Sequence, residues 1–132
     1  MNRPKFKAPV PSESQEQIVI FRWKQLMINR YYELRTMFAV PNGGHRHPAV
    51  GAKMKREGAL AGVSDIMLPV AKGKYHGLFV ELKRKAGSHT SEAQKEFQAL
   101  VNDNGYLAVV CRGADEAIET IENYLNLGVF TG

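Results

Sequence analysis

The sequence is nearly free of cysteine, since Cys111 is the single one among 132 residues. This excludes an intrachain disulfide, and the apolar run YLAVVCR around Cys111 indicates a buried core thiol rather than a nucleophile. No apolar run approaches the roughly 20 residues that a membrane span needs, and no signal peptide is visible. We therefore expect a cytoplasmic protein in a reducing compartment, with no membrane partner.

The sequence also lacks internal repeats and low-complexity tracts, and it has fewer acidic than basic residues. Eighteen Lys and Arg against thirteen Asp and Glu give a net charge of +5. The length of 132 residues predicts one domain with a core of moderate size. The excess of positive charge is compatible with a polyanionic partner, although charge alone does not identify one.

Local patterns divide the chain into an arm and one domain. Residues 1–11, MNRPKFKAPVP, combine three prolines with three cations and predict a flexible basic arm before a domain over 12–132. Ser12 or Ser14 can cap a first helix, which we expect to run to about Arg35. Helical spacing predicts its buried face: Val19, Ile20, Trp23, Met27 and Tyr31.

The remaining patterns alternate strands and helices. We expect strands over 36–41, 65–70, 77–83 and 106–111, and helices from about 49 to 58, 91–103 and 114–125. The nearly continuous apolar run over 106–111 is typical of an interior strand covered on both faces. The predicted fold class is therefore α/β, with a mixed central sheet flanked by helices.

Two charges interrupt the apolar strand over 77–83. Strand alternation places Glu81 and Lys83 on one face, roughly 6–7 Å apart along the strand. If the two neighbouring strands form a hairpin, Asp65 can reach Glu81, and two converging carboxylates favour a hard divalent cation between them. Lys83 could then orient or deprotonate a water, or stabilise charge on a phosphate. The alternative is a solvent-facing pair of Glu81 with Lys83.

The wider pattern resembles a known family. The segments PSESQEQIVIFRW, AVPNGG, GVSDIML, GLFVELKRKAGSHTSEAQKEF and NGYLAVVCRG stand in this order. Together they resemble the VRR-NUC (virus-type replication-repair nuclease) branch of the PD-(D/E)xK nuclease superfamily, from about residue 12 to about residue 125. The resemblance implies a restriction-endonuclease-like core and Mg²⁺- or Mn²⁺-dependent cleavage of DNA. It also implies a phage or bacterial homodimer in the cytoplasm of a bacterial or infected host cell, acting in DNA repair on four-way (Holliday) junctions.

The same resemblance assigns roles by position. It implies that Asp65 and Glu81 bind the metal together with the carbonyl of Leu82, and that Lys83 is the catalytic lysine. Ser64 stands where that branch often has proline. Gln94 matches a glutamine of the active site, but it also fits a capping box with Ser91 in the pattern Ser91-x-x-Gln94.

An acid on the first helix completes the ligand set that the resemblance implies. Glu13 matches the Ser-Glu start of the family pattern, and Glu16 shares a helical face with the predicted buried residues. Either acid could instead simply stabilise the first turn through the helix dipole. We favour Glu13 slightly as the ligand and keep Glu16 as the alternative.

Basic residues near these motifs are candidate contacts to DNA phosphates, which would bind without reading sequence. The turn signal at Asn42 predicts a loop that borders the site, or a plain tight turn. Two other functions remain open, a DNA-binding module without catalysis and a flap or restriction-type nuclease of the same fold. The candidate DNA contacts are Asn42, Lys53, Lys55, Arg56, Arg84 and Lys85.

Overall fold

The computed structural model describes residues 8–41 and 47–132. Two of its helices begin at the capping boxes that the sequence contains, because Ser12 pairs with Gln15 and Ser91 pairs with Gln94. The elements in chain order are α1 (Glu13–Met27), the 3₁₀ helix η1 (Tyr32–Thr36), β1 (Phe38–Ala39), α2 (Pro48–Arg56), β2 (Ile66–Leu68), β3 (Leu78–Lys83), α3 (Glu92–Asp103), β4 (Leu107–Arg112) and α4 (Ala114–Leu125).

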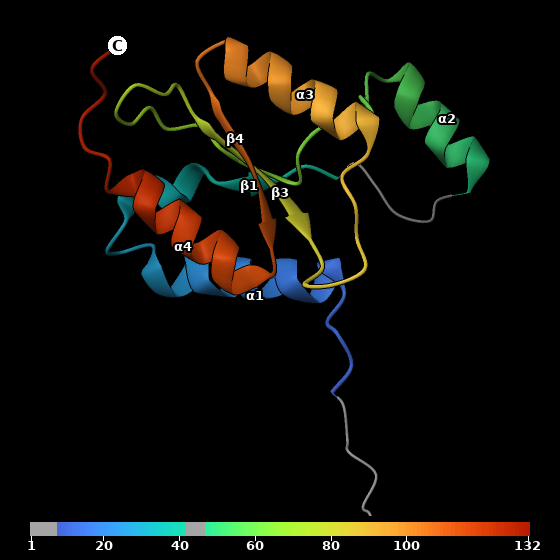
Figure 1. The fold of residues 1–132 in the computed structure, drawn as a ribbon, viewed down its shortest axis with the longest axis horizontal. Helices are drawn as coiled ribbons and strands as arrows, with labels where there is room; N and C mark the ends of the chain where they lie inside the picture. The colour runs from blue at the N-terminus through green and yellow to red at the C-terminus, as the bar shows by residue number, and fades with distance from the viewer. Residues whose placement is uncertain (1–7, 42–46) are drawn as a thin grey trace, which may run out of the picture.

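The described strands form one mixed sheet in the order β1-β2-β3-β4. β1 and β2 pair antiparallel, β2 and β3 pair antiparallel, and β3 pairs parallel with β4. α1 and α4 cover one face of this sheet and α3 covers the other (Figure 1). The prediction of an α/β fold with a mixed sheet flanked by helices is therefore confirmed.

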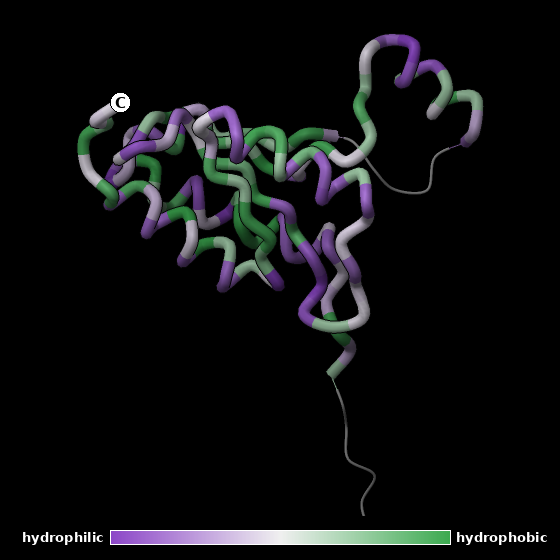
Figure 2. The backbone as a smooth tube through the Cα atoms, turned by 45° about the horizontal axis from the view of Figure 1, so that its top comes forward, coloured by the Kyte–Doolittle hydropathy of each residue, from purple (hydrophilic) through white to green (hydrophobic). Residues whose placement is uncertain are grey.

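The core lies between the sheet and the α1–α4 pair. Leu78, Val80 and Leu82 of β3 point into it and meet Ile20 of α1 and Ile121 of α4, all of which are buried. Figure 2 shows hydrophobic residues concentrated along the central strands, with hydrophilic residues spread over the outer helices. Because side chains alternate along a strand, the intervening residues of β3 point toward α3, where the candidate site lies.

The first helix is shorter than the sequence predicts. α1 ends at Met27, and η1 follows as a separate element rather than continuing to Arg35. The apolar pattern continues because Leu34 of η1 is fully buried, so periodicity alone does not reveal where the helix ends. The predicted burial of Val19 is also wrong, since its side chain is 44% exposed.

The predicted interior strand is an edge strand in the described sheet. β4 pairs with β3 alone among the described strands, so the prediction of an interior position is wrong. Its apolar sequence has another cause, because α3 packs on one face of β4 and α4 on the other. The helices α3 and α4 were predicted correctly, within a residue at each end.

Peripheral segments frame this core. α2 has no buried residue, and Figure 1 shows it projecting beyond α3. Most of the predicted arm over 1–11 lies outside the described residues, but the carbonyl of Val10 accepts a hydrogen bond from Arg84 Nη2 at 3.3 Å. Within the described residues, no helix is long and apolar enough to cross a membrane.

Candidate active site

The β2–β3 hairpin brings Asp65 beside Glu81. Ile66 pairs with Val80 in an antiparallel register, so Asp65, just before Ile66, lies opposite Glu81, just after Val80. Oδ2 of Asp65 accepts a hydrogen bond of 2.7 Å from the main-chain N–H of Leu82. This bond fixes the half-buried Asp65 side chain against the end of β3, as the predicted hairpin requires.

Glu81 and Lys83 lie side by side on the α3 face of β3. The Lys83 Nζ to Glu81 Oε1 distance is 3.7 Å, and the two side chains are only 7% and 2% exposed. The alternative of a solvent-facing pair is therefore wrong. A buried pair of this kind is costly to desolvate, so its presence on the sheet calls for a role other than solubility.

Gln94 joins the two charged residues from the first turn of α3. Its Nε2 donates to Glu81 Oε1 at 2.7 Å, and its Oε1 accepts from Lys83 Nζ at 2.9 Å. The same Oε1 accepts from the main-chain N–H of Ser91 at 2.9 Å, which completes the capping box. The predicted capping box is therefore confirmed, and the same amide bridges Glu81 and Lys83, which is the position that an active-site glutamine would need.

The carboxyl groups of Asp65 and Glu81 both have raised pKa values. Burial, and then the charge of Asp65, raise the pKa of Glu81 from 4.5 to about 8, although Lys83 opposes this rise. Burial also raises the pKa of Asp65, against the hydrogen bond from Leu82. Without a further cation, the buried site therefore favours a proton on the pair over two full negative charges.

The donor set fits a hard divalent cation. Oε2 of Glu81 is buried and accepts no hydrogen bond from the described residues when both acids are charged. A proton shared with Asp65 can join the two carboxyl groups, and a cation can take the place of that proton. The carbonyl of Lys83 accepts from Gly113 on the β4 side, and strand alternation turns the Leu82 carbonyl to the other side, toward Asp65. In the described part of the chain, no three Asp, Glu, His or Cys side chains form a ligand group alone. Two carboxylates with one carbonyl suit Mg²⁺, which usually keeps several waters.

The two acids of α1 have different surroundings. Glu13 lies half-buried in the first turn, and its negative charge contributes to the raised pKa of Glu81. Glu16 is 5% exposed, and its Oε2 accepts a hydrogen bond from the main-chain N–H of Ala114. Glu16 thus has a protein partner for its carboxylate, whereas the negative charge of Glu13 adds to the rise in the pKa of Glu81.

The candidate DNA contacts are spread over three segments. Lys53, Lys55 and Arg56 form the exposed, basic last turn of α2, where Lys53 also lies 4.0 Å from Glu57. Asn42 lies outside the described residues.

The other two candidates follow β3 directly. Arg84 reaches the segment before α1, and the stem of the exposed Lys85 covers Gly113. These cations therefore lie beside the end of the strand that carries Glu81 and Lys83.

Local sequence patterns do not reveal the role of Gly62. Its φ is +91°, and a Cβ there would clash with the Ala93 carbonyl and lie 2.9 Å from the Gln94 nitrogen. Glycine therefore lets the loop before β2 pack against the first turn of α3. The contact partner is 31 residues away, so no local pattern reveals it.

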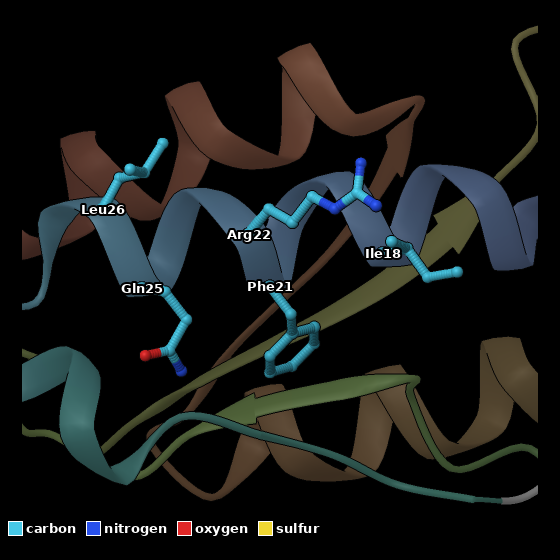
Figure 3. A pocket seen from close by; sticks show the side chains of 5 residues that line it. All are labelled: Ile18, Phe21, Arg22, Gln25 and Leu26. Atoms are coloured by element: carbon cyan, nitrogen blue, oxygen red, sulfur yellow. The ribbon is translucent and has the colours of Figure 1, made fainter.

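A second surface lies on the outer side of α1. A hollow of about 620 Å³ is lined by side chains at the spacing of one helix face: Ile18, Phe21, Arg22, Gln25 and Leu26 (Figure 3). Ile18 is 51% exposed and Leu26 is 82% exposed. This apolar stripe faces away from the α4 contact that carries Glu16 and is a candidate surface for protein association.

The capping boxes provide a matched test of Gln94. For the DNA cleavage that the family resemblance implies, we expect Gln94→Ala to be about 10- to 100-fold slower than wild type, because Glu81 and Lys83 lose the amide that aligns them. Gln15→Ala is the control, since it removes the same cap on α1 without touching Glu81 or Lys83. Single-turnover cleavage of both variants is the measurement, and equal rates would contradict the role of the bridge.

Comparison with known proteins agrees with this geometry. Residues 12–115 match the VRR-NUC domain family. A solved structure described as a VRR_NUC domain protein is similar to this chain, with 32% sequence identity and a TM-score of 0.78. The similarity covers 94% of this chain and 96% of that one. No curated protein matches the chain. The match over residues 12–115 shows that this chain belongs to the VRR-NUC domain family, a nuclease family of the PD-(D/E)xK type.

Proposed function

We propose that this protein is a metal-dependent, structure-specific DNA endonuclease that hydrolyses phosphodiester bonds. Branched DNA is the proposed substrate, with the four-way (Holliday) junction first, in the replication or repair of a bacterium or phage. The observation that carries the proposal is the cluster of buried Glu81 and Lys83 with half-buried Asp65 and Gln94. In a nuclease family, such a cluster joins a cation-binding carboxylate pair to a lysine and thus suits phosphodiester hydrolysis.

The proposed cofactor is Mg²⁺, or Mn²⁺, held by Asp65, Glu81 and the carbonyl of Leu82. Glu13 is the proposed helix-1 ligand and would have to move toward this pair on metal binding, because no three acidic side chains of the described residues already form a ligand group. When bound, the ion neutralises the carboxylate pair, activates water and offsets charge that develops on the phosphate. Oε2 of Glu81 supports this assignment, because this buried carboxylate oxygen accepts no hydrogen bond from the described residues when both acids are charged.

Lys83 has the role of orienting the attacking water or stabilising the phosphoryl oxygen. Its ammonium donates to Gln94 and lies near Glu81, so its position is set before substrate binds. Such preorganisation avoids a reorganisation cost during the reaction. Water then attacks the phosphorus in line, the bond to the 3′ oxygen breaks, and a 5′-phosphate results.

Recognition of DNA by shape is consistent with the size of the domain. The basic last turn of α2 and the cations after β3 provide phosphate contacts without base reading. A junction needs cuts on two strands, so we propose a homodimer that brings two sites together, with the apolar stripe on α1 as its surface. Sedimentation equilibrium of the purified protein tests this, and a monomer at micromolar concentration would contradict it.

The function is tested with wild type and Glu81→Ala on labelled four-way junction, flap, single-stranded and linear duplex DNA. Each substrate is incubated with Mg²⁺, Mn²⁺ or EDTA. We expect metal-dependent cleavage that Glu81→Ala loses, with the junction cut fastest, because Glu81 supplies a ligand that no neighbour replaces. A preference for flaps or for a linear site would instead favour a flap or restriction-type nuclease.

A DNA-binding module without catalysis would give a different result in this experiment. If no substrate is cut under any metal while gel shifts still show binding, the protein is a DNA-binding module with the same fold. Binding by such a module needs no divalent ion, because it depends on the basic surface alone. The metal titration of binding therefore separates the two classes.

A further inference from the structure

Glu16 is a buried acid that the proposed chemistry does not use. It lies one helical turn after Glu13 on the same side of α1, and its carboxylate accepts the main-chain N–H of Ala114, the first residue of α4. We propose that Glu16 is a positioning residue that caps α4 from α1 and so holds Glu13 beside the active-site end of β3. This inference rests on the proposed function.

The cap comes from another helix because α4 has none of its own. Its N-cap residue is Gly113, with a φ of +87° and no side chain to bond the first turn. α1 and α3 are capped by the serines that precede them, whereas α4 is capped by a carboxylate 98 residues earlier in the chain. A negative group at a helix N-terminus is favoured by the exposed N–H groups and the helix dipole.

Glycine at 113 leaves the room that this contact needs. A Cβ there would lie 2.8 Å from Glu16 Oε2 and 2.7 Å from Lys85 Cε. The stem of Lys85 thus lies over the same point and shields the contact between the carboxylate and the amide from water. The three residues form one packed junction between α1, the end of β4 and the segment that follows β3.

The junction is bonded directly to the active-site strand. The main-chain N–H of Gly113 donates to the carbonyl of Lys83 at 2.9 Å. Lys83 is thus hydrogen-bonded to Gly113, and the next residue, Ala114, is hydrogen-bonded to Glu16. Glu13 lies one turn before Glu16 on α1. Since α1 packs against both α4 and β3, the position of Glu13 relative to Glu81 depends on how firmly α1 is held at this junction.

The experiment compares Glu16→Ala and Glu16→Gln with Glu13→Gln. Glu16→Gln keeps an oxygen that can accept the Ala114 N–H, so we expect cleavage within about 3-fold of wild type and the same Mg²⁺-induced rise in melting temperature. Glu16→Ala loses the cap. We expect its kcat to fall about 10- to 100-fold with KM nearly unchanged, faster amide exchange at Ala114, and a smaller Mg²⁺-induced rise. Glu13→Gln is expected to lose most of the Mg²⁺-induced rise in melting temperature.

Two results would overturn the proposal. Loss of the Mg²⁺-induced rise in Glu16→Gln, equal to that in Glu13→Gln, would make Glu16 a ligand. Wild-type cleavage and an unchanged Mg²⁺-induced rise in Glu16→Ala, despite a lower melting temperature, would make it a purely stabilising residue. If wild type cuts no DNA, the proposed function fails, and the Mg²⁺-induced rise of Glu16→Ala alone decides the positioning role: a smaller rise supports it and an equal rise refutes it.

Discussion

Lys83→Ala is expected to lower DNA cleavage at least about 100- to 1000-fold while DNA binding stays within a few-fold of wild type. The loss follows from the position of the Lys83 ammonium, which is buried between Glu81 and Gln94. No other cation of the described residues lies within salt-bridge distance of Glu81, so none can replace it. Binding is retained because most phosphate contacts come from exposed cations outside the site. Single-turnover cleavage and gel-shift affinity measure the two quantities separately.

Lys95→Ala is the matched control for this change. It removes the same charge from the protein, but Lys95 is 60% exposed on α3, and its one ion pair among the described residues is with Glu92, at 3.3 Å. We expect its cleavage rate to stay near that of wild type, since an exposed pair contributes little. Cleavage by Lys83→Ala at the rate of the Lys95 control would show that the role given to Lys83 is wrong.

Glu81→Gln is expected to stabilise the metal-free protein at pH 8 while it abolishes metal-dependent cleavage. The pKa of Glu81 rises from 4.5 to about 8 in the folded protein, through burial and the charge of Asp65. Between these pH values the folded state holds a proton that the unfolded chain has lost, so the free energy of unfolding falls as pH rises. The contribution of Glu81 is complete below about pH 4.5 and is lost by about pH 8.

The size of this effect is large for a single side chain. The rise in pKa corresponds to roughly 5 kcal/mol, and we expect about 2–4 kcal/mol in practice, because Asp65 shares the proton. Glu81→Gln in EDTA should therefore melt several degrees above wild type at pH 8 and close to it at pH 5. Added Mg²⁺ should raise the melting temperature of wild type at pH 8 and leave that of Glu81→Gln nearly unchanged.

Glu96→Gln serves as the control for the pH series. Glu96 is an exposed acid on α3, so its replacement should leave the pH dependence of melting as in wild type. Thermal melts at half-unit steps from pH 5 to pH 8 give the comparison. A wild-type melting temperature that does not fall across this range in EDTA would contradict the raised pKa of Glu81.

The fold was predictable where local signals agree with tertiary packing. α3 and α4 were located because a serine cap or a glycine precedes each and an apolar stripe follows. The end of α1 was missed because Leu34 carries the apolar pattern past Met27 into η1. The edge position of β4 was missed because an apolar strand is equally explained by a neighbouring strand or by helices on both faces.

The candidate site shows the same division. Strand alternation was enough to place Glu81 and Lys83 on one face, and the hairpin length allowed Asp65 to reach them. Their burial was not predictable, because α3 comes from a later segment and its distance from β3 is set by packing. The bridge by Gln94 and the close approach at Gly62 depend on that packing and appear only in the folded chain.

The sequence by itself determined the α/β class, the helix caps and the set of charged residues on β3, because each depends on residues within one or two turns or strand steps. Only the tertiary structure revealed that Glu16 bonds the main chain at the start of α4, a contact that Glu13 does not share. Both acids occupy one side of α1, and their surroundings differ because the main-chain N–H of Ala114, 98 residues later, donates to Glu16, while Gly113 leaves the space for this contact. Contacts between distant segments depend on how whole helices and strands pack, so they cannot be predicted from the local spacing of residues.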